Sequence, residues 1–155
     1  MSADEGGDPA CWAHLFGDQR PDVATRRDVE LLVRTFYRAA AMDEILGPVF
    51  QAAHVDWPEH LAVVSEFWMD QLFGTGRYGG NPLRAHGPVD RRTPLTTAHF
   101  DRWLQLFDET VDELFDGPVA DRAKARAATM ARAIQRLLRG RPDPGSSPIE
   151  VRWRR

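Results

Sequence analysis

The chain has 155 residues with acidic and basic side chains intermixed, and its formal net charge is −3. This length fits one domain with a sizeable core, and the lack of a basic stripe argues against nucleic-acid binding. No apolar run approaches the roughly 20 residues of a membrane span. The first residues do not form a secretory signal, so we expect a cytoplasmic protein without a membrane partner. The single cysteine excludes an internal disulfide and a cysteine-only metal site.

The two ends of the chain differ in composition from its middle. Residues 1–22 are rich in Gly, Asp and Pro, which predicts a flexible N-terminal arm. Residues 141–155 contain three prolines and no periodicity, which predicts a flexible C-terminal tail. Residues 23–140 are therefore expected to form the domain.

The domain begins with a helical pattern. Residues 25–28 have the composition of a capping box, and the apolar stripe behind them predicts a helix that ends near Met42. A short turn with a Gly-Pro breaker is expected over 43–50. Asp56 is predicted to cap a second long helix, which runs to about Phe73, where glycines end it.

The second half of the domain continues this pattern after a glycine-rich loop. A very short helix is expected between Pro82 and the breaker Gly87-Pro88, followed by a polar linker. Thr97 is predicted to cap a third long helix, and a Gly-Pro break separates it from a last helix that Gly140 closes. Because no segment alternates with a period of two, we predict an all-α domain with four substantial helices and one very short one.

Three of the predicted long helices place one polar side chain on an apolar face. Tyr37 and Trp103 lie on two of these stripes, and His60 heads a third. Taken singly, Tyr37 and Trp103 are more often core residues that bond to a backbone carbonyl, and His60 is more often a half-exposed histidine of a first helical turn. Together they have the composition of a ligand pocket, in which a few placed polar groups stand in an apolar lining.

His86 adds a fourth polar group, on the very short helix. It is either a loop histidine or one strong ligand held in an aromatic-lined cavity. A single neutral imidazole suits haem iron, whereas a zinc site needs three or four protein ligands. The chain lacks the His-Glu-x-x-His and Cys-x-x-Cys patterns of zinc sites and the Cys-x-x-Cys-His pattern of covalently attached haem.

Several segments of the chain, in one order, resemble the truncated haemoglobins, specifically their third (P-type) group. These segments are LLVRTFYRAA, LGPVF, WPEHLAVVSEFWMDQLFG, YGGNPLRAH and HFDRWLQLF. The resemblance covers roughly residues 26–138. It implies a truncated globin fold, which is a two-over-two helical sandwich with a very short proximal helix, around a non-covalent haem b (iron protoporphyrin IX).

The resemblance also implies roles for individual residues. His86 matches the proximal iron ligand, and Tyr37, His60 and Trp103 match distal side chains that stabilise a bound ligand. His99 begins a helix and is interpreted as structural. The remaining expected haem contacts are Phe50, Val64, Phe67, Trp68 and Met130, and the candidates for the haem propionates are Arg77, Tyr78 and Arg84.

A globin of this kind binds oxygen and other diatomic gases, such as nitric oxide, at ferrous iron. Hydrogen bonds from Tyr37 and Trp103, at roughly 1–1.5 kcal/mol each, would slow oxygen release by about 10²-fold. We therefore expect oxygen sequestration, or nitric oxide dioxygenase-like or peroxidase-like chemistry, rather than oxygen delivery. Two roles are open for His60: it gates ligand access, or it binds the iron when no other ligand is present.

Two alternatives stay open at this point. One is a haem-based gas or redox sensor, which would need an output segment longer than the two ends of the chain. The other is a cofactor-free helical interaction module, in which His86 is a loop histidine. A reductase is an open partner, and the sequence is compatible with a monomer or a weak oligomer.

Overall fold

The computed structural model describes residues 19–139, with the backbone alone at residues 83, 84, 87 and 92. All regular elements in this range are helices. They are α1 (Arg26–Met42), α2 (Gly47–Ala52), α3 (Trp57–Phe73), α4 (Pro82–Arg92), α5 (Thr97–Leu114) and α6 (Pro118–Arg139). The predicted tail and all but the last four residues of the predicted arm lie outside the described residues.

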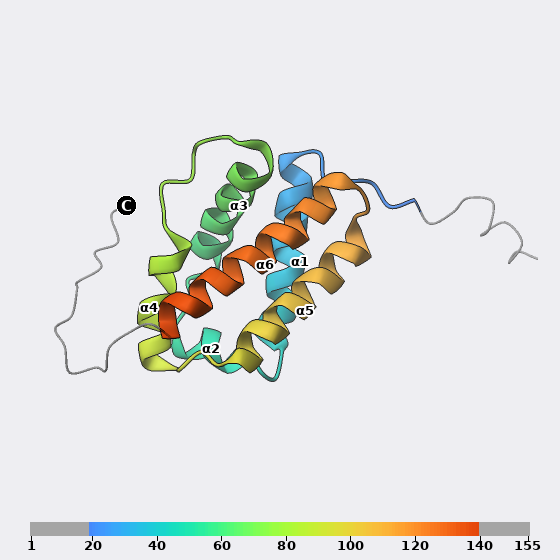
Figure 1. Ribbon diagram of the computed structural model, residues 1–155. Coiled ribbons are helices and arrows are strands. Elements are labelled where there is room, and N and C mark those ends of the chain that lie inside the picture. The colour runs from blue at the N-terminus through green and yellow to red at the C-terminus, as the bar shows by residue number, and fades with distance from the viewer. Residues whose placement is uncertain (1–18, 140–155) are drawn as a thin grey trace, which may run out of the picture.

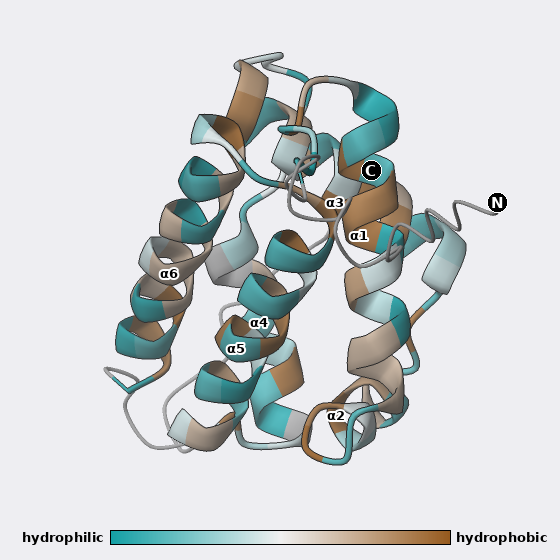
Figure 2. Cartoon of the chain, turned by 90° about the vertical axis from the view of Figure 1, so that its right-hand side faces the viewer, coloured by the Kyte–Doolittle hydropathy of each residue, from teal (hydrophilic) through white to brown (hydrophobic). Residues whose placement is uncertain are grey.

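The four long helices form two layers (Figure 1). α1 packs on α3 and α5 packs on α6, while further contacts join α1 to α5 and α3 to α6. Hydrophilic residues follow the outer faces of α5 and α6 (Figure 2), so their apolar residues lie inside. The predicted all-α, two-over-two sandwich is confirmed. No helix among residues 19–139 combines the length and the apolarity that crossing a bilayer requires.

Aromatic side chains from three helices fill the space between the layers. Phe36 of α1 and Phe107 of α5 are each 1% exposed, and their rings meet edge to face at 5.5 Å. Trp68 of α3 stacks on Phe107 at 5.0 Å. Because truncation of a buried phenylalanine removes apolar contacts and leaves a cavity, alanine at either position would cost about 3–5 kcal/mol of stability.

The caps predicted for the first two long helices are confirmed. Thr25 and Asp28 form the capping box of α1, with each side chain bonded to the backbone N–H of the other. The Asp56 carboxylate accepts the N–H of Glu59 at 3.3 Å and so caps α3. Gly74 ends α3 at a φ of 63°, a left-handed conformation that favours glycine.

The predicted cap of α5 is wrong by one residue. Thr96, and not Thr97, is the extended residue before the helix. Its backbone N–H donates to Nδ1 of His99 at 3.0 Å, so a histidine takes the place that glutamate has in a capping box. The structural interpretation of His99 is confirmed.

The Gly-Pro pair at residues 47–48 begins a helix, where the sequence suggested a turn. Pro48 lies in the first turn of α2, where its missing N–H costs nothing because that N–H would have no intrahelical partner. A Cβ on Gly47 would lie 2.9 Å from the carbonyl oxygen of Ala41, so only glycine allows this close approach of α2 to α1.

The second predicted breaker, Gly87-Pro88, does not end its helix either. α4 runs for 11 residues with Pro88 inside it, so the prediction of a very short helix that stops before this pair is wrong. Proline removes one hydrogen bond, but its fixed φ is compatible with a helix. Backbone hydrogen bonds remain on both sides of Pro88. The N–H of Ala85 donates to the carbonyl oxygen of Asn81 at 3.1 Å, and the N–H of Thr93 donates to that of Val89 at 2.9 Å. Packing on α6 and α2 supports the helix.

The residues just before α1 are tied to the start of α6. The Asp22 carboxylate accepts backbone N–H groups of Val119 at 2.9 Å and Ala120 at 2.8 Å. The carbonyl oxygen of Pro21 accepts the N–H of Asp116 at 3.1 Å. Residues 21 and 22, which the sequence assigned to the arm, therefore belong to the helical domain by their hydrogen bonds.

Candidate functional site

Four aromatic rings from three helices meet on one side of the core. The ring of Tyr37 on α1 stands perpendicular to that of His60 on α3, with centroids 4.7 Å apart and an interplanar angle of 89°. Phe50 of α2 lies 5.9 Å from Tyr37. Trp57, the first residue of α3, lies 5.9 Å from His60 and 5.4 Å from Phe50. The structure thus brings together three predicted site residues and one that sequence reasoning missed.

The missed residue, Trp57, carried a signal. It precedes His60 by three residues on the same helix, which puts the two side chains on one face. The sequence reasoning treated the start of this helix only as a cap and did not extend the stripe backward. What the spacing could not show is that the Trp57 ring also meets Tyr37 and Phe50, since these contacts depend on how α1 and α2 pack.

The polar atoms of this cluster have no partner among the described residues. His60 Nε2 is buried without a hydrogen bond. Burial, together with the positive charge that His86 can carry, lowers the pKa of His60 to about 4, so its imidazole is neutral at pH 7. Burial raises the pKa of the Tyr37 phenol above its usual range, so the hydroxyl keeps its proton. A neutral imidazole and a protonated phenol thus face the same space.

Trp103 lies next to this cluster, one ring away. Its indole stacks on Phe107 at 5.2 Å and meets the edge of Phe36 at 5.1 Å. Phe36 in turn meets Tyr37 at 4.8 Å. Within residues 19–139 the indole N–H has no hydrogen bond. The core role in which this N–H bonds to a backbone carbonyl is therefore not what the structure shows.

His86 is held in one tautomer by its own helix. Its Nδ1 donates to the carbonyl oxygen of Pro82 at 2.6 Å, one turn earlier in α4. A carbonyl can only accept, so Nδ1 carries the proton and Nε2 keeps its lone pair. Burial lowers the pKa of His86, and the bond to Pro82 partly opposes this, so the ring is neutral at pH 7. An oriented neutral imidazole with a free Nε2 is the form that binds a metal.

The helices that carry His60 and His86 do not pack on each other. α4 packs on α6 and α2, and α3 packs on α1 and α6. A proton on His86 would nevertheless oppose a proton on His60 and, after burial, helps to lower the pKa of His60. His86 would hold the iron of a haem through Nε2, and His60 would supply a neutral polar group to the same site. The residues present therefore fit a haem.

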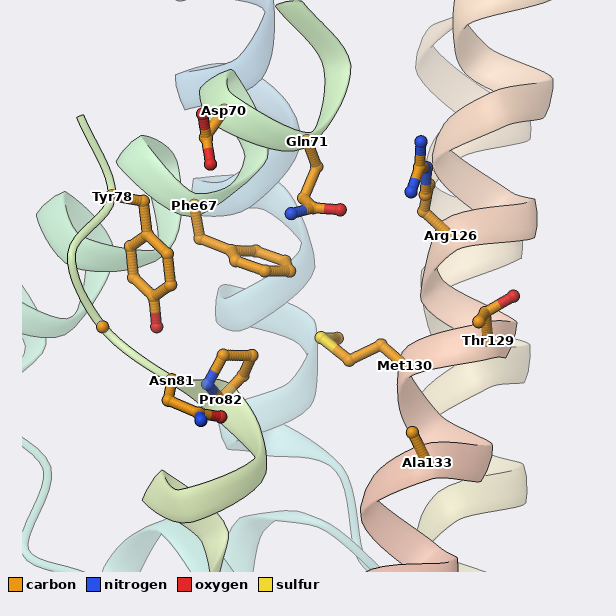
Figure 3. Close-up of a pocket in the computed structure, with 11 residues that line it drawn as sticks. Phe67, Asp70, Gln71, Tyr78, Asn81, Pro82, Arg126, Thr129, Met130 and Ala133 are labelled. Atoms are coloured by element: carbon orange, nitrogen blue, oxygen red, sulfur yellow. The ribbon is translucent and has the colours of Figure 1, made fainter. Parts of the chain in front are cut away.

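A cavity of about 440 Å³ lies beside this arrangement, between α3, the loop before α4, and α6 (Figure 3). Three of the predicted haem contacts, Phe67, Tyr78 and Met130, line it. His86 is not a lining residue, but Pro82, which orients it, is. The other lining residues are Asp70, Gln71, Gly80, Asn81, Arg126, Thr129 and Ala133.

The remaining predicted contacts have varied surroundings. Trp68 is 2% exposed and stacks on Phe107, so it belongs to the core. Val64 is partly buried and packs against the same core. Arg77 is exposed. The hydrogen bond from Arg26 is the main cause that lowers the pKa of Glu66, and the charge of Arg77 lowers it further. The side chain of Arg84 lies outside the described part of the chain.

Comparisons with known proteins find relatives of this chain in sequence and in fold. The group 3 truncated hemoglobin ctb of Campylobacter jejuni is 29% identical over 121 residues, which are 76% of this chain and 93% of that protein. The crystal structure of group III truncated hemoglobin from Campylobacter jejuni superposes with a TM-score of 0.68 and 27% identity, over 83% of this chain and all of that chain. These matches support the identification of the chain as a group III truncated haemoglobin.

A second solved structure extends the match. Chlamydomonas reinhardtii THB1 superposes on this truncated haemoglobin with a TM-score of 0.55 and 29% identity, over 74% of this chain and 89% of that one. No protein-family model matches the chain. Membership of the family implies a haem cofactor and a globin role in binding diatomic gases.

Proposed function

We propose that this truncated haemoglobin holds haem b without a covalent bond, with Nε2 of His86 as the iron ligand. When bound, the haem would supply the iron at which a diatomic gas binds. The observation that carries the proposal is the 2.6 Å bond from His86 Nδ1 to the Pro82 carbonyl oxygen. It fixes the tautomer and the direction of the ring, because the carbonyl belongs to the same helix, one turn before the histidine.

The distal pocket supplies donors on the opposite side. The Tyr37 hydroxyl keeps its proton and has no other partner among the described residues, so it is free to donate to a gas ligand. The Trp103 indole N–H is a second donor on the adjoining wall. Each hydrogen bond contributes roughly 1–1.5 kcal/mol, and together they slow release by about 10²-fold.

Slow release favours functions other than oxygen delivery. A pocket that retains oxygen suits sequestration, the oxidation of nitric oxide by oxygen, or the reduction of peroxide. Repeated oxidation of nitric oxide requires an electron for each cycle, so that activity would need a reductase as partner. The polar pair Tyr37 and Trp103 supports this set of functions.

His60 adds a third polar group to the pocket. Its pKa of about 4 keeps the imidazole neutral at pH 7, and its buried Nε2 lacks a partner. We propose that this nitrogen either binds the iron when no gas is present or moves aside to admit one. Trp57 and Tyr37, whose rings contact that of His60, restrict this movement.

Reconstitution tests the proposal directly. The purified chain should take up haem in a 1:1 ratio, show a Soret band, and, once reduced, bind oxygen with a slow off-rate. A chain that gains no Soret absorption after haem is added would be a cofactor-free module. If the chain takes up haem but releases oxygen as fast as a globin whose pocket has no hydrogen-bond donors, the proposed distal donors are refuted and the proposal of haem binding still holds.

A further inference from the structure

Arg126 of α6 is a cation without an ion pair at the cavity between α3 and α6. Three other cations among the described residues have acidic partners: Arg26 bonds to Glu66, Arg102 to Asp43 and Lys124 to Asp112. Arg126 lines the cavity and has neither an ion pair nor a hydrogen bond within residues 19–139. Its exposed guanidinium can accommodate an anion.

The interior of the same cavity is apolar. Phe67 of α3 and Met130 of α6 point toward each other across it (Figure 3). Pro82 and Ala133 add further apolar surface. An apolar body would bury this surface, which contributes about 25 cal/mol for each Å² removed from water.

Some polar side chains around Arg126 already have hydrogen-bond partners among the described residues, and this decides which of them can bind a ligand. The Gln71 side chain extends from α3 with its amide oxygen on the side where Arg126 lies and its nitrogen on the other side (Figure 3), and the amide has no hydrogen bond within the described residues, so it can rotate to donate. Thr129 is already engaged, since its hydroxyl donates to the Ala125 carbonyl oxygen at 3.1 Å. Asp70 would repel an anion, but its Oδ1 accepts the N–H of Gly76 at 2.6 Å, which holds this carboxylate at the loop. Arg126 and Gln71 are therefore the donors that remain.

We propose that Arg126, assisted by the Gln71 amide, binds a carboxylate whose apolar body occupies this cavity. A guanidinium and an amide donate to carboxylate oxygens, and the apolar walls select an amphipathic ligand over a small anion. The carboxylate has two sources with the same chemistry: a propionate of the haem, or a free carboxylic acid with an alkyl chain. The first source rests on the proposed function, and the second does not.

The first arm of the test separates propionate binding from haem binding in general. Haem and haem dimethyl ester, whose propionates carry no charge, are titrated into the chain and into Arg126→Gln. We expect Arg126→Gln to lower the affinity for haem about tenfold and to leave the affinity for the dimethyl ester unchanged. Only the free propionate carries a charge, so only haem loses a charged hydrogen bond to Arg126. Arg126→Lys should restore part of the affinity. Arg132→Gln, on an exposed position of α6 that does not line the cavity, is the matched control.

The second arm tests a free carboxylic acid. Decanoate and the neutral decanamide are titrated calorimetrically into the haem-loaded and haem-free chain. If haem affinity does not depend on Arg126, decanoate should bind, Arg126→Gln should weaken it about tenfold, and decanamide should be insensitive to the substitution. That result assigns the site to a free carboxylic acid.

The remaining outcomes are decisive. If Arg126→Gln changes neither haem nor decanoate affinity relative to Arg132→Gln, the carboxylate site is wrong. If the unsubstituted chain takes up no haem, the proposed function fails, and the decanoate titration alone decides this inference. Equal thermal unfolding of both variants would show that any change in affinity does not come from loss of structure.

Discussion

His86 Nδ1 lies 2.6 Å from the carbonyl oxygen of Pro82, the residue that begins α4. The first turn of a helix has free N–H groups but no free carbonyls, so this oxygen is shared with the backbone of the next turn. The histidine is thus oriented by its own helix and needs no partner from elsewhere in the fold. This makes the direction of Nε2 a local property of α4, and it leads to the first prediction.

Replacement of His86 by glycine should abolish the normal haem spectrum. The iron loses its protein ligand, while the cavity left by the side chain can admit free imidazole. We expect the Soret band of the His86→Gly variant to be weak and shifted, and added imidazole to restore it. His54→Asn is the control, because His54 is exposed at a φ of 49°, a conformation that asparagine tolerates. Unchanged coordination in His86→Gly would refute the ligand assignment.

Removal of the distal donors should accelerate oxygen release. Tyr37→Phe deletes only a hydroxyl, and Trp103→Phe deletes the indole N–H while it keeps an aromatic ring beside Phe36. Each substitution should raise the oxygen off-rate by about tenfold, since each removes one hydrogen bond of roughly 1–1.5 kcal/mol. Stopped-flow displacement of oxygen by carbon monoxide measures the rate. If neither variant changes it, the distal donors are misassigned.

The ring of Trp57 should control the position of His60. Its edge-to-face contact with the imidazole is one of two that restrain it, and such contacts contribute about 0.5–1.5 kcal/mol. Trp57→Leu should therefore increase the population of a displaced His60 by about 3–10-fold and raise the carbon monoxide association rate in proportion. Trp57→Phe should show a smaller increase. Equal rates in both variants and the parent chain would mean that Trp57 only packs.

The haem-free chain should lose stability between pH 6.5 and pH 4 because of His60. Its folded pKa of about 4 lies below the ordinary value of 6.5, so the unfolded state binds more protons in this window. The contribution is complete above pH 6.5 and decreases as the pH falls toward 4, by up to about 3 kcal/mol. Urea unfolding at several pH values should show this loss, and His60→Gln should make it smaller. Burial lowers the pKa of His86 as well, so some pH dependence will persist.

Asp22 lies before α1 and should stabilise the fold because its carboxylate caps the start of α6. Its carboxylate accepts three backbone N–H groups, those of Val23, Val119 and Ala120. Asp22→Ala should cost about 2–3 kcal/mol at pH 7, and Asp22→Asn less, because an amide oxygen can accept some of these bonds. Asp101→Ala, at an exposed position of α5, is the control for urea unfolding.

The pH dependence of the Asp22 variants provides a second check. Burial alone would raise the pKa of Asp22, but the three N–H groups and the charge of Arg122 lower it. A depressed carboxylate pKa means that the stabilisation is complete above the unfolded value of about 3.9 and is lost as the pH falls through the folded pKa. The gap between parent and Asp22→Ala should therefore narrow in acid. A constant gap would show that the carboxylate charge is not involved.

Much of this protein follows from local sequence. Apolar periodicity and caps determine the long helices, because they depend on residues three or four positions apart, as the Thr25 box and the Gly74 end of α3 show. The same spacing puts Tyr37, His60 and Trp103 on inner faces. Five segments spread over residues 26–138 indicate the truncated haemoglobins, and the sequence match and the fold support that identification.

Tertiary structure decided what local rules misjudged. Gly87-Pro88 is a breaker by composition, yet α4 continues through it because packing on α6 and α2 outweighs one lost hydrogen bond. Trp57 meets Tyr37 and Phe50 only because α1 and α2 bring these rings against it. Arg126 faces a cavity only because α6 crosses beside α3 and the loop before α4. These contacts join residues far apart in the chain, and their geometry depends on helix packing, which sequence periodicity does not encode.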